Sequence, residues 1–296
     1  KTTGQRWWIE SLLGELDRTG LTDYIRWKIS CRVDDIDSDL LACCHDHGLI
    51  AVFLGVESGN PVGLHTFNKL VTVAQNISAI QLLKDIGITF NMGFMLFDPD
   101  STFETIRQNL VFLRSVVGDG SCAVNFCKML PYGGTPIETR LKQEGRLKGT
   151  IDQPDYDFLD TRVDWYAFFA AMSFRTRNFD SLGLVERLGV AKLDQTLAQE
   201  FEPADWVDDY NDKLMEITSS ANKIALDVLE KALDFVETRE TNVLIADWSL
   251  LGLVAESLWE EDTRLQKELD EVLAVYNPDL LEGYREEFFD RPQINE

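Results

Sequence analysis

Two long runs of apolar residues constrain what this chain can fold into. Residues 49–55 are LIAVFLG and residues 88–97 are ITFNMGFMLF. A strand that is covered on both faces needs apolar residues throughout, whereas a half-exposed strand alternates apolar and polar residues. Each run follows a helical pattern that ends at a glycine, Gly48 or Gly87, as at many helix ends. The two runs therefore predict buried strands of a parallel sheet.

Helical and strand patterns alternate through the first half of the chain. The expected helices cover residues 7–20, 38–47, 72–86, 101–116 and 136–144, and the expected strands cover residues 25–32, 49–55, 88–97 and 123–130. Asp37 is the expected N-cap of the second helix, and Ser101 or Thr102 that of the fourth, with Glu104 completing a capping box with Ser101. Strands separated by helices of this length form βαβ units. The predicted fold class is therefore α/β, with the chemistry at the carboxyl ends of parallel strands.

Beyond about residue 160 the strand patterns stop. Residues 165–174, 208–238 and 243–277 show helical patterns, and residues 152–160 are the expected linker. We therefore expect an α/β part, residues 1–150, followed by a mainly α-helical part, residues 151–296.

Most of the net charge of −23 lies in the second part. Residues 1–150 contain 15 Lys and Arg against 17 Asp and Glu, and residues 151–296 contain 13 against 34. Such a surface repels a phosphate backbone, so we expect no nucleic-acid partner. A solvated helical surface explains the charge, and contact with a basic partner is the alternative. No apolar run reaches the roughly 20 residues of a membrane span, and five cysteines, an odd number, favour a reducing cytoplasm.

Distinctive residues follow the predicted strands. They are Arg32-Val33-Asp34, Gly55-Val56-Glu57-Ser58-Gly59, Asn68-Lys69 before a helix capped by Thr72, Gly93-Phe94-Met95-Leu96-Phe97-Asp98-Pro99, Leu130-Pro131-Tyr132 with Gly134-Thr135-Pro136, and Glu144-Gly145-Arg146-Leu147. In this order and spacing they resemble the radical S-adenosylmethionine (SAM) superfamily, specifically the branch whose members often carry an N-terminal cobalamin-binding domain. The resemblance covers about residues 5–150 and implies the later strands of a partial TIM-like (βα) barrel.

The resemblance also implies a cofactor-binding set. Glu57 stands at the ribose-binding position, and a carboxylate accepts hydrogen bonds from both ribose hydroxyls. Arg32 would hold the SAM carboxylate through a bidentate fork. The structural alternatives are a salt bridge between Arg32 and Glu57, or between Arg32 and Asp34. The full set is Glu57, Arg32, Ser58, Gly93, Met95, Leu130 and Pro131, of which the apolar members would contact adenine or pack in the core.

The cysteines needed for an iron–sulfur cluster are missing from this sequence. The superfamily supplies three thiolates from a Cys-x-x-x-Cys-x-x-Cys loop. No such spacing occurs among Cys31, Cys43, Cys44, Cys122 and Cys127, which we interpret as buried or incidental thiols, so we predict no metal site. The expected cofactors are SAM, a [4Fe–4S] cluster whose ligands lie outside this chain, and, as a further candidate, cobalamin. The expected partner is the N-terminal half of the barrel, in a longer parent chain or a second polypeptide.

Several hypotheses of function follow. In the first, the chain is part of a radical SAM enzyme, inactive in isolation, with cobalamin-dependent methyl transfer as the first candidate reaction. In the second, it is a catalytically inert binding or scaffold module; an unrelated α/β enzyme that binds a nucleoside is a third alternative. The substrate stays open. Aromatic residues between Trp165 and Phe174, with Arg175, could close the barrel over a substrate, although packing of an aromatic helix face is favoured.

Overall fold

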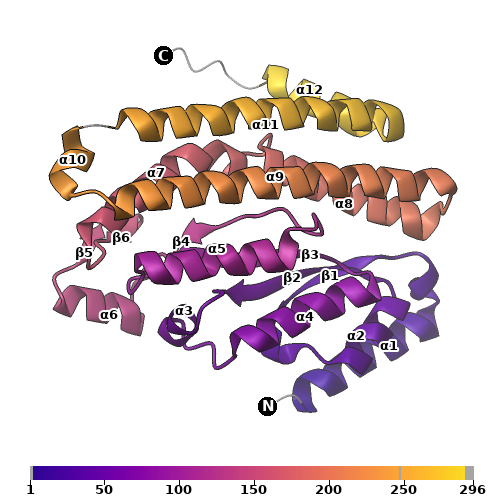
Figure 1. Ribbon diagram of the computed structural model, residues 1–296. Helices are drawn as coiled ribbons and strands as arrows, with labels where there is room; N and C mark the ends of the chain where they lie inside the picture. Colours follow the sequence, from indigo (N-terminus) through magenta and orange to yellow (C-terminus); the bar gives the residue numbers. More distant parts are fainter. Residues whose placement is uncertain (1–2, 247, 291–296) are drawn as a thin grey trace.

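The computed structural model describes residues 3–246 and 248–290, and it contains an open parallel sheet with helices around it (Figure 1). The four strands of this sheet are β1 (Trp27–Arg32), β2 (Leu49–Glu57), β3 (Thr89–Phe97) and β4 (Cys127–Lys128). All neighbours are parallel, in the order β1-β2-β3-β4. Consecutive strands are therefore neighbours, as in part of a (βα) barrel. The predicted fold class, a partial barrel followed by a helical region, is confirmed.

The two faces of the sheet differ. Helices α2 (Ser38–Asp46), α4 (Val73–Ile86) and α5 (Phe103–Val117) pack on one face, where Val52, Leu54 and Val56 of β2 are buried. The other face is contacted by α8 (Leu184–Phe201), whose Thr196 hydroxyl lies 2.7 Å from that of Thr89 at the start of β3. Phe53 in the middle of β2 stays 49% exposed on that face. The face opposite α4 and α5 thus has room for a ligand.

Local capping explains where the helices begin. Asp37 accepts a hydrogen bond of 2.9 Å from the Leu40 amide, as predicted for α2. Thr72 and Gln75 form a capping box at α4. At α5 the box joins Thr102 and Thr105, so the predicted box of Ser101 with Glu104 is wrong. The Ser101 hydroxyl instead accepts from the Asp98 amide at 2.9 Å, which closes the turn after β3.

The fourth predicted strand, residues 123–130, is reduced to two residues. Asn222, in α9 (Asp205–Glu237), takes the place of a neighbouring strand. Its side-chain oxygen accepts from the Val124 amide at 2.7 Å, and its amide nitrogen donates to the Cys122 carbonyl at 2.8 Å. Because the Asn222 side chain makes these hydrogen bonds to the backbone, the segment does not need to pair with a neighbouring strand before Cys127.

The second half is helical, with additions that the sequence patterns did not predict. Its helices besides α8 and α9 are α7 (Thr161–Phe179), α10 (Thr241–Ala246), α11 (Ser249–Tyr276) and α12 (Pro278–Asp290). The expected linker at residues 152–160 includes β6 (Pro154–Tyr156), which pairs antiparallel with β5 (Leu147–Gly149). The helix α8 was not predicted at all. The remaining helices are α1 (Thr3–Thr19), α3 (Pro61–Thr66) and α6 (Pro136–Gln143).

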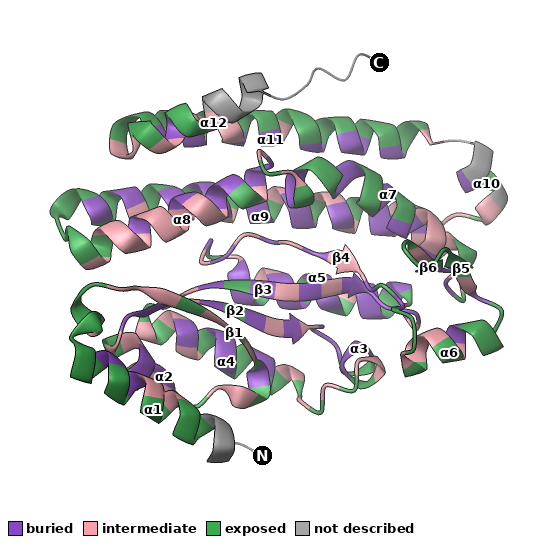
Figure 2. Ribbon diagram, turned by 180° about the vertical axis from the view of Figure 1, so that it is seen from behind, coloured by how far each residue is buried: buried purple, intermediate pink, exposed green. Residues whose placement is uncertain are grey.

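The helical region packs directly on the sheet region. Leu96 of β3, Phe174 of α7, Leu229 of α9 and Leu258 of α11 belong to one hydrophobic core, and Figure 2 shows the buried residues running through α9 and the central strands. A domain boundary near residue 150 stays a prediction. Within residues 3–246 and 248–290, no helix combines the length and apolar character needed to cross a membrane.

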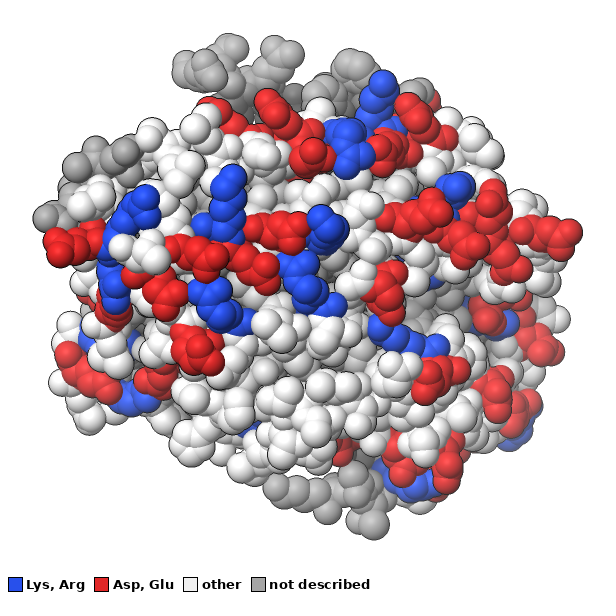
Figure 3. Space-filling model, viewed as in Figure 1, with Lys and Arg blue, Asp and Glu red and all other residues white. Residues whose placement is uncertain are grey.

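Ion pairs reinforce the seam between α5 and α9. Arg107 lies 2.9 Å from Asp234, and Arg114 lies 2.9 Å from both Asp227 and Glu230. Figure 3 shows the corresponding band of mixed charge across this face. Part of the negative charge of the second half is therefore matched by arginines of the first half.

Candidate cofactor-binding site

The most unusual backbone in the sheet lies at the carboxyl end of β2. Glu57 has a φ of 65°, in the left-handed region that residues other than glycine rarely adopt. The Ser58 amide donates to the Val56 carbonyl at 2.9 Å, so these residues form a γ-turn centred on Glu57. Such strain of about 1–3 kcal/mol persists where surrounding contacts enforce it, and it concentrates at functional sites.

Buried amides hold this turn in place. Ser58 and Asn60 are fully buried. The Asn109 side-chain oxygen, from α5, accepts from the Ser58 hydroxyl at 3.1 Å and from the Gly59 amide at 2.8 Å. Asn76 of α4 donates to the Ser58 carbonyl at 2.9 Å. The hydroxyl of Ser58, a predicted cofactor-binding residue, is therefore engaged within the turn.

The Glu57 carboxylate pairs with a lysine. Lys69 Nζ lies 2.8 Å from Glu57 Oε1, and the two side chains are only 15% and 17% exposed. Lys69 stands between two further residues with positive φ, Asn68 at 51° and Leu70 at 55°. A strained loop therefore presents this ammonium group to Glu57.

Arg32 lies beside this pair without touching Glu57. Its Nε donates to Asp34 Oδ1 at 2.8 Å, and the other end of the guanidinium donates to the Lys69 carbonyl at 2.9 Å. Of the two alternatives left open by the sequence, the pairing with Asp34 is the one that forms. The Arg32 hydrogen bond is the main cause that lowers the pKa of Asp34. A role of Arg32 in holding the SAM carboxylate stays a prediction.

Two glycines leave the backbone bare next to Glu57. Gly55 of β2 and Gly93 of β3 face each other in register. A Cβ on Gly55 would lie 3.0 Å from Glu57 Oε1, and a Cβ on Gly93 would lie 3.9 Å from Glu57 Oε2 and 3.1 Å from the Phe53 ring. A flat ligand can therefore approach the strand backbone beside the carboxylate.

The remaining predicted residues border the same region to different extents. Met95 pairs with Cys127 of β4 and is partly buried. Leu130 is 44% exposed, whereas Pro131 is buried. Burial is the first cause that raises the pKa of the Cys127 thiol, and the Glu57 charge is the second. The charge at the end of β2 thus acts on a side chain of β4.

About half of this chain is similar in sequence to two anaerobic cyclases. The anaerobic magnesium-protoporphyrin IX monomethyl ester cyclase of Rubrivivax gelatinosus is 39% identical over 137 residues, which are 46% of this chain and 24% of the relative. The cyclase of the same name from Cereibacter sphaeroides is 29% identical over 147 residues, which are 49% and 23% of the two chains. No family model matches the chain.

A solved structure shares the fold. The cobalamin-dependent S-adenosylmethionine radical enzyme OxsB, with aqua-cobalamin bound, matches 90% of this chain and 46% of its own, with a TM-score of 0.52 and 15% identity. The chain is therefore similar in fold to part of a cobalamin-dependent radical SAM enzyme. The resemblance inferred from the strand-end motifs is confirmed. The chain spans about a quarter of the length of the two cyclases.

The chain's own residues fit SAM but not the iron–sulfur cluster that a radical SAM enzyme needs. A strained carboxylate beside bare backbone suits a nucleoside. A cluster needs converging thiolates, and within residues 3–246 and 248–290 no three His, Cys, Asp or Glu side chains are placed to share a metal ion. Burial raises the pKa of the Cys31 and Cys44 thiols to about 11, so both are protonated at neutral pH.

Sequence reasoning missed the residues that support Glu57. Lys69 was noted as part of a motif but given no role, and Asn76 and Asn109 were not singled out. The sequence does indicate that Asn109 is buried, because it lies on the apolar face of α5 between Ile106 and Leu113, which are both fully buried. A buried amide in such a face needs hydrogen-bond partners from another element.

Proposed function

We propose that this chain forms the SAM-binding carboxyl half of the barrel in a radical SAM enzyme. The observation that carries the proposal is the Glu57 carboxylate, held in a γ-turn at the end of β2 beside Gly55 and Gly93. In this proposal Glu57 accepts hydrogen bonds from the ribose hydroxyls, while Arg32 pairs with the SAM carboxylate. The segment from Gly93 to Met95, with Leu130 and Pro131, borders the adenine.

The rest of the enzyme would come from outside this chain. A [4Fe–4S] cluster, when bound, would supply the electron that cleaves SAM reductively, and its thiolates would come from the N-terminal half of the barrel. We propose cobalamin as a second cofactor, because it is bound in OxsB, and radical conversion of an organic substrate, such as methyl transfer, as the reaction. Since all five cysteines are free thiols, we place the enzyme in a reducing cytoplasm.

Replacing Glu57 with glutamine tests the proposed ribose contact. An amide loses the charge-assisted hydrogen bonds of a carboxylate, so SAM affinity should fall about tenfold, or roughly 1.4 kcal/mol. Isothermal titration of SAM into the full-length, anaerobically reconstituted protein measures it. Glu104→Gln, a neutralised exposed carboxylate on α5, is the matched control. Equal SAM affinity in both variants would mean that Glu57 does not contact SAM. A wild-type protein that binds no SAM would favour the inert-module hypothesis.

Replacing Gly93 with alanine tests the bare backbone surface. The new methyl group would lie 3.1 Å from the partly exposed Phe53 ring, which can move, so the free energy of unfolding should change by less than about 1 kcal/mol. The same methyl group would occupy space beside Glu57, and SAM affinity should fall about tenfold. Titration of SAM and urea unfolding together check both expectations. Unchanged SAM affinity would place the nucleoside elsewhere.

A further inference from the structure

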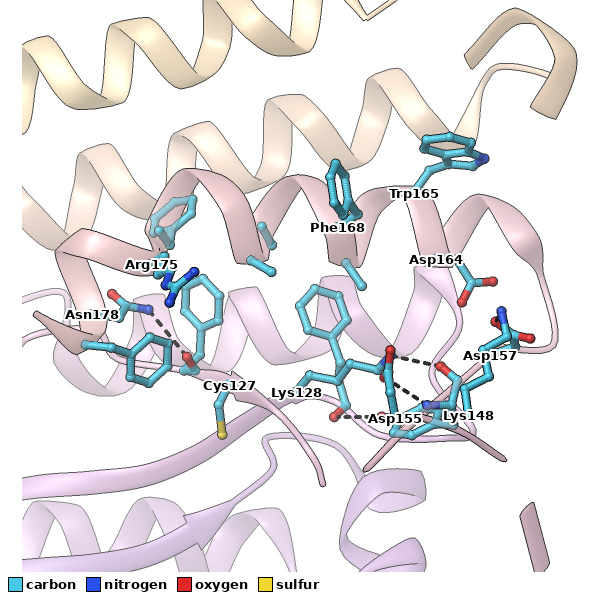
Figure 4. A pocket seen from close by; sticks show the side chains of 18 of the residues that line it. Cys127, Lys128, Lys148, Asp155, Asp157, Asp164, Trp165, Phe168, Arg175 and Asn178 are labelled. Atoms are coloured by element: carbon cyan, nitrogen blue, oxygen red, sulfur yellow. Dashed lines mark hydrogen bonds and ion pairs between the residues drawn. The ribbon is translucent and has the colours of Figure 1, made fainter. Parts of the chain in front are cut away.

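A second hollow lies between β4 and α7. Its volume is about 680 Å³, within the roughly 300–1,000 Å³ of typical small-molecule sites. Side chains reach it from α7, from β4 and from the hairpin β5–β6, and Figure 4 shows most of those that line it. The proposed SAM contacts at Glu57, Arg32 and Gly93 are not among its lining residues. We call it the α7 trough.

The shape of the α7 trough comes from three alanines. Ala167, Ala170 and Ala171 recur at helical spacing along the side of α7 that lines it. Their small side chains leave space that larger residues would fill. Aromatic rings line the remaining wall, including Phe126 and Phe174, whose centroids are 5.1 Å apart. A narrow apolar space beside aromatic rings suits a planar apolar group.

The charges in the α7 trough are unevenly divided. At one end Lys128 lies 2.5 Å from Asp155, Lys148 pairs with Asp157, and the Asp164 carboxylate accepts from the Phe158 amide at 3.1 Å. At the other end Arg175 extends from α7 toward the strand that carries Cys127 (Figure 4). Arg175 forms no ion pair in the part of the chain that the structure describes, residues 3–246 and 248–290. That end is therefore positively charged and open to an anion.

The α7 trough adjoins the carboxyl ends of the strands. Cys127 lines it and pairs with Met95 across the β3–β4 ladder. The neighbouring Glu57 charge also acts on the Cys127 thiol. A molecule in the trough would therefore lie next to a nucleoside bound at Glu57.

We propose that the α7 trough binds the substrate, and that the substrate is a planar, largely apolar organic anion. Its apolar body would lie along the alanines of α7, and its anionic group would pair with Arg175. The guanidinium group favours carboxylate and similar planar anions because of its fixed fork of donors. Its role as the substrate site rests on the proposed function, whereas its preference for such ligands does not.

Two dyes that differ by one anionic group test the site. 8-Anilino-1-naphthalenesulfonate is an anion with a flat, apolar naphthalene ring, and N-phenyl-1-naphthylamine is its neutral analogue. Both should bind the full-length protein at one site, as followed by fluorescence titration. Ala171→Trp should weaken both dyes at least tenfold because the indole fills the trough. The control is Met172→Trp, at a position on α7 that is 58% exposed and outside the lining.

Arg175→Gln separates charge recognition from shape. It should weaken the sulfonate dye about tenfold and leave the neutral dye unchanged. Equal binding of both dyes to Ala171→Trp and Met172→Trp would overturn the proposed site, and equal weakening of both dyes by Arg175→Gln would overturn the anion preference. SAM titration of the same variants distinguishes the two proposals. If the wild-type protein binds no SAM, the proposed function is contradicted. If it binds SAM but Ala171→Trp leaves both dye affinities unchanged, only the proposed α7 trough is contradicted.

Discussion

Replacing Asp262 with alanine is expected to lower the free energy of unfolding by about 3–5 kcal/mol, because it leaves a buried charge without its partner. The partner is Arg177 of α7, whose side chain is 1% exposed. Its guanidinium donates to Asp262 of α11 and, at 2.8 Å, to the Ala221 carbonyl of α9. Burial lowers the pKa of Arg177, which shows how unfavourable this environment is for the charge. The pair therefore connects three helices of the second half, α7, α9 and α11.

Two comparisons separate this effect from ordinary surface changes. Arg264→Ala removes exposed pairs with Glu261 and Glu268 on the same helix and should cost less than about 1 kcal/mol. The double variant Arg177→Met with Asp262→Leu replaces the whole buried pair by apolar groups and should recover most of the stability. Equilibrium urea unfolding of the three proteins measures these differences. A cost for Asp262→Ala no larger than that of Arg264→Ala would mean that water or another group already compensates Arg177.

The central strands could be predicted because their signal is local. The apolar runs at residues 49–55 and 88–97 lie inside β2 and β3 or within one residue of their ends. The fourth strand could not be delimited, because the Cys122 carbonyl and the Val124 amide are bonded by Asn222, about a hundred residues later in the chain. No periodicity near residue 123 carries that information. The same limit applies to α8. Few residues form its apolar stripe, and its burial depends on contacts with other helices that the local sequence does not show.

The candidate site divides in the same way. Glu57 and Gly93 could be predicted because they belong to motifs whose order along the chain is itself informative. The partner of Glu57 could not, because Arg32 and Lys69 both carry a positive charge near the strand ends. The backbone decides between them: positive φ values at Asn68 and Leu70 turn the Lys69 ammonium toward the carboxylate, while Asp34 takes Arg32.

Replacing Asn109 with leucine is expected to destabilise the protein by about 2–4 kcal/mol and to weaken SAM binding as well. The Asn109 amide is buried and bonds the Gly59 amide at 2.8 Å and the Leu96 carbonyl at 3.3 Å. Leucine leaves both backbone groups without a partner, and each unsatisfied buried group costs about 1–3 kcal/mol. The Ser58 hydroxyl and the Asn60 amide still bond each other at 3.0 Å, so their loss is smaller.

The site should respond because Asn109 supports the turn that strains Glu57. Without the bond to Gly59, the backbone after β2 is free to relax from the left-handed conformation, and the carboxylate moves away from the bare surface of Gly93. The neighbouring Gln108→Leu is the matched control, since Gln108 is exposed and its replacement should change stability by less than about 0.5 kcal/mol. Urea unfolding and SAM titration are compared for both variants. Equal results would show that the turn keeps its shape without Asn109, and the conformation of Glu57 would then be enforced by Asn76 and the Lys69 loop.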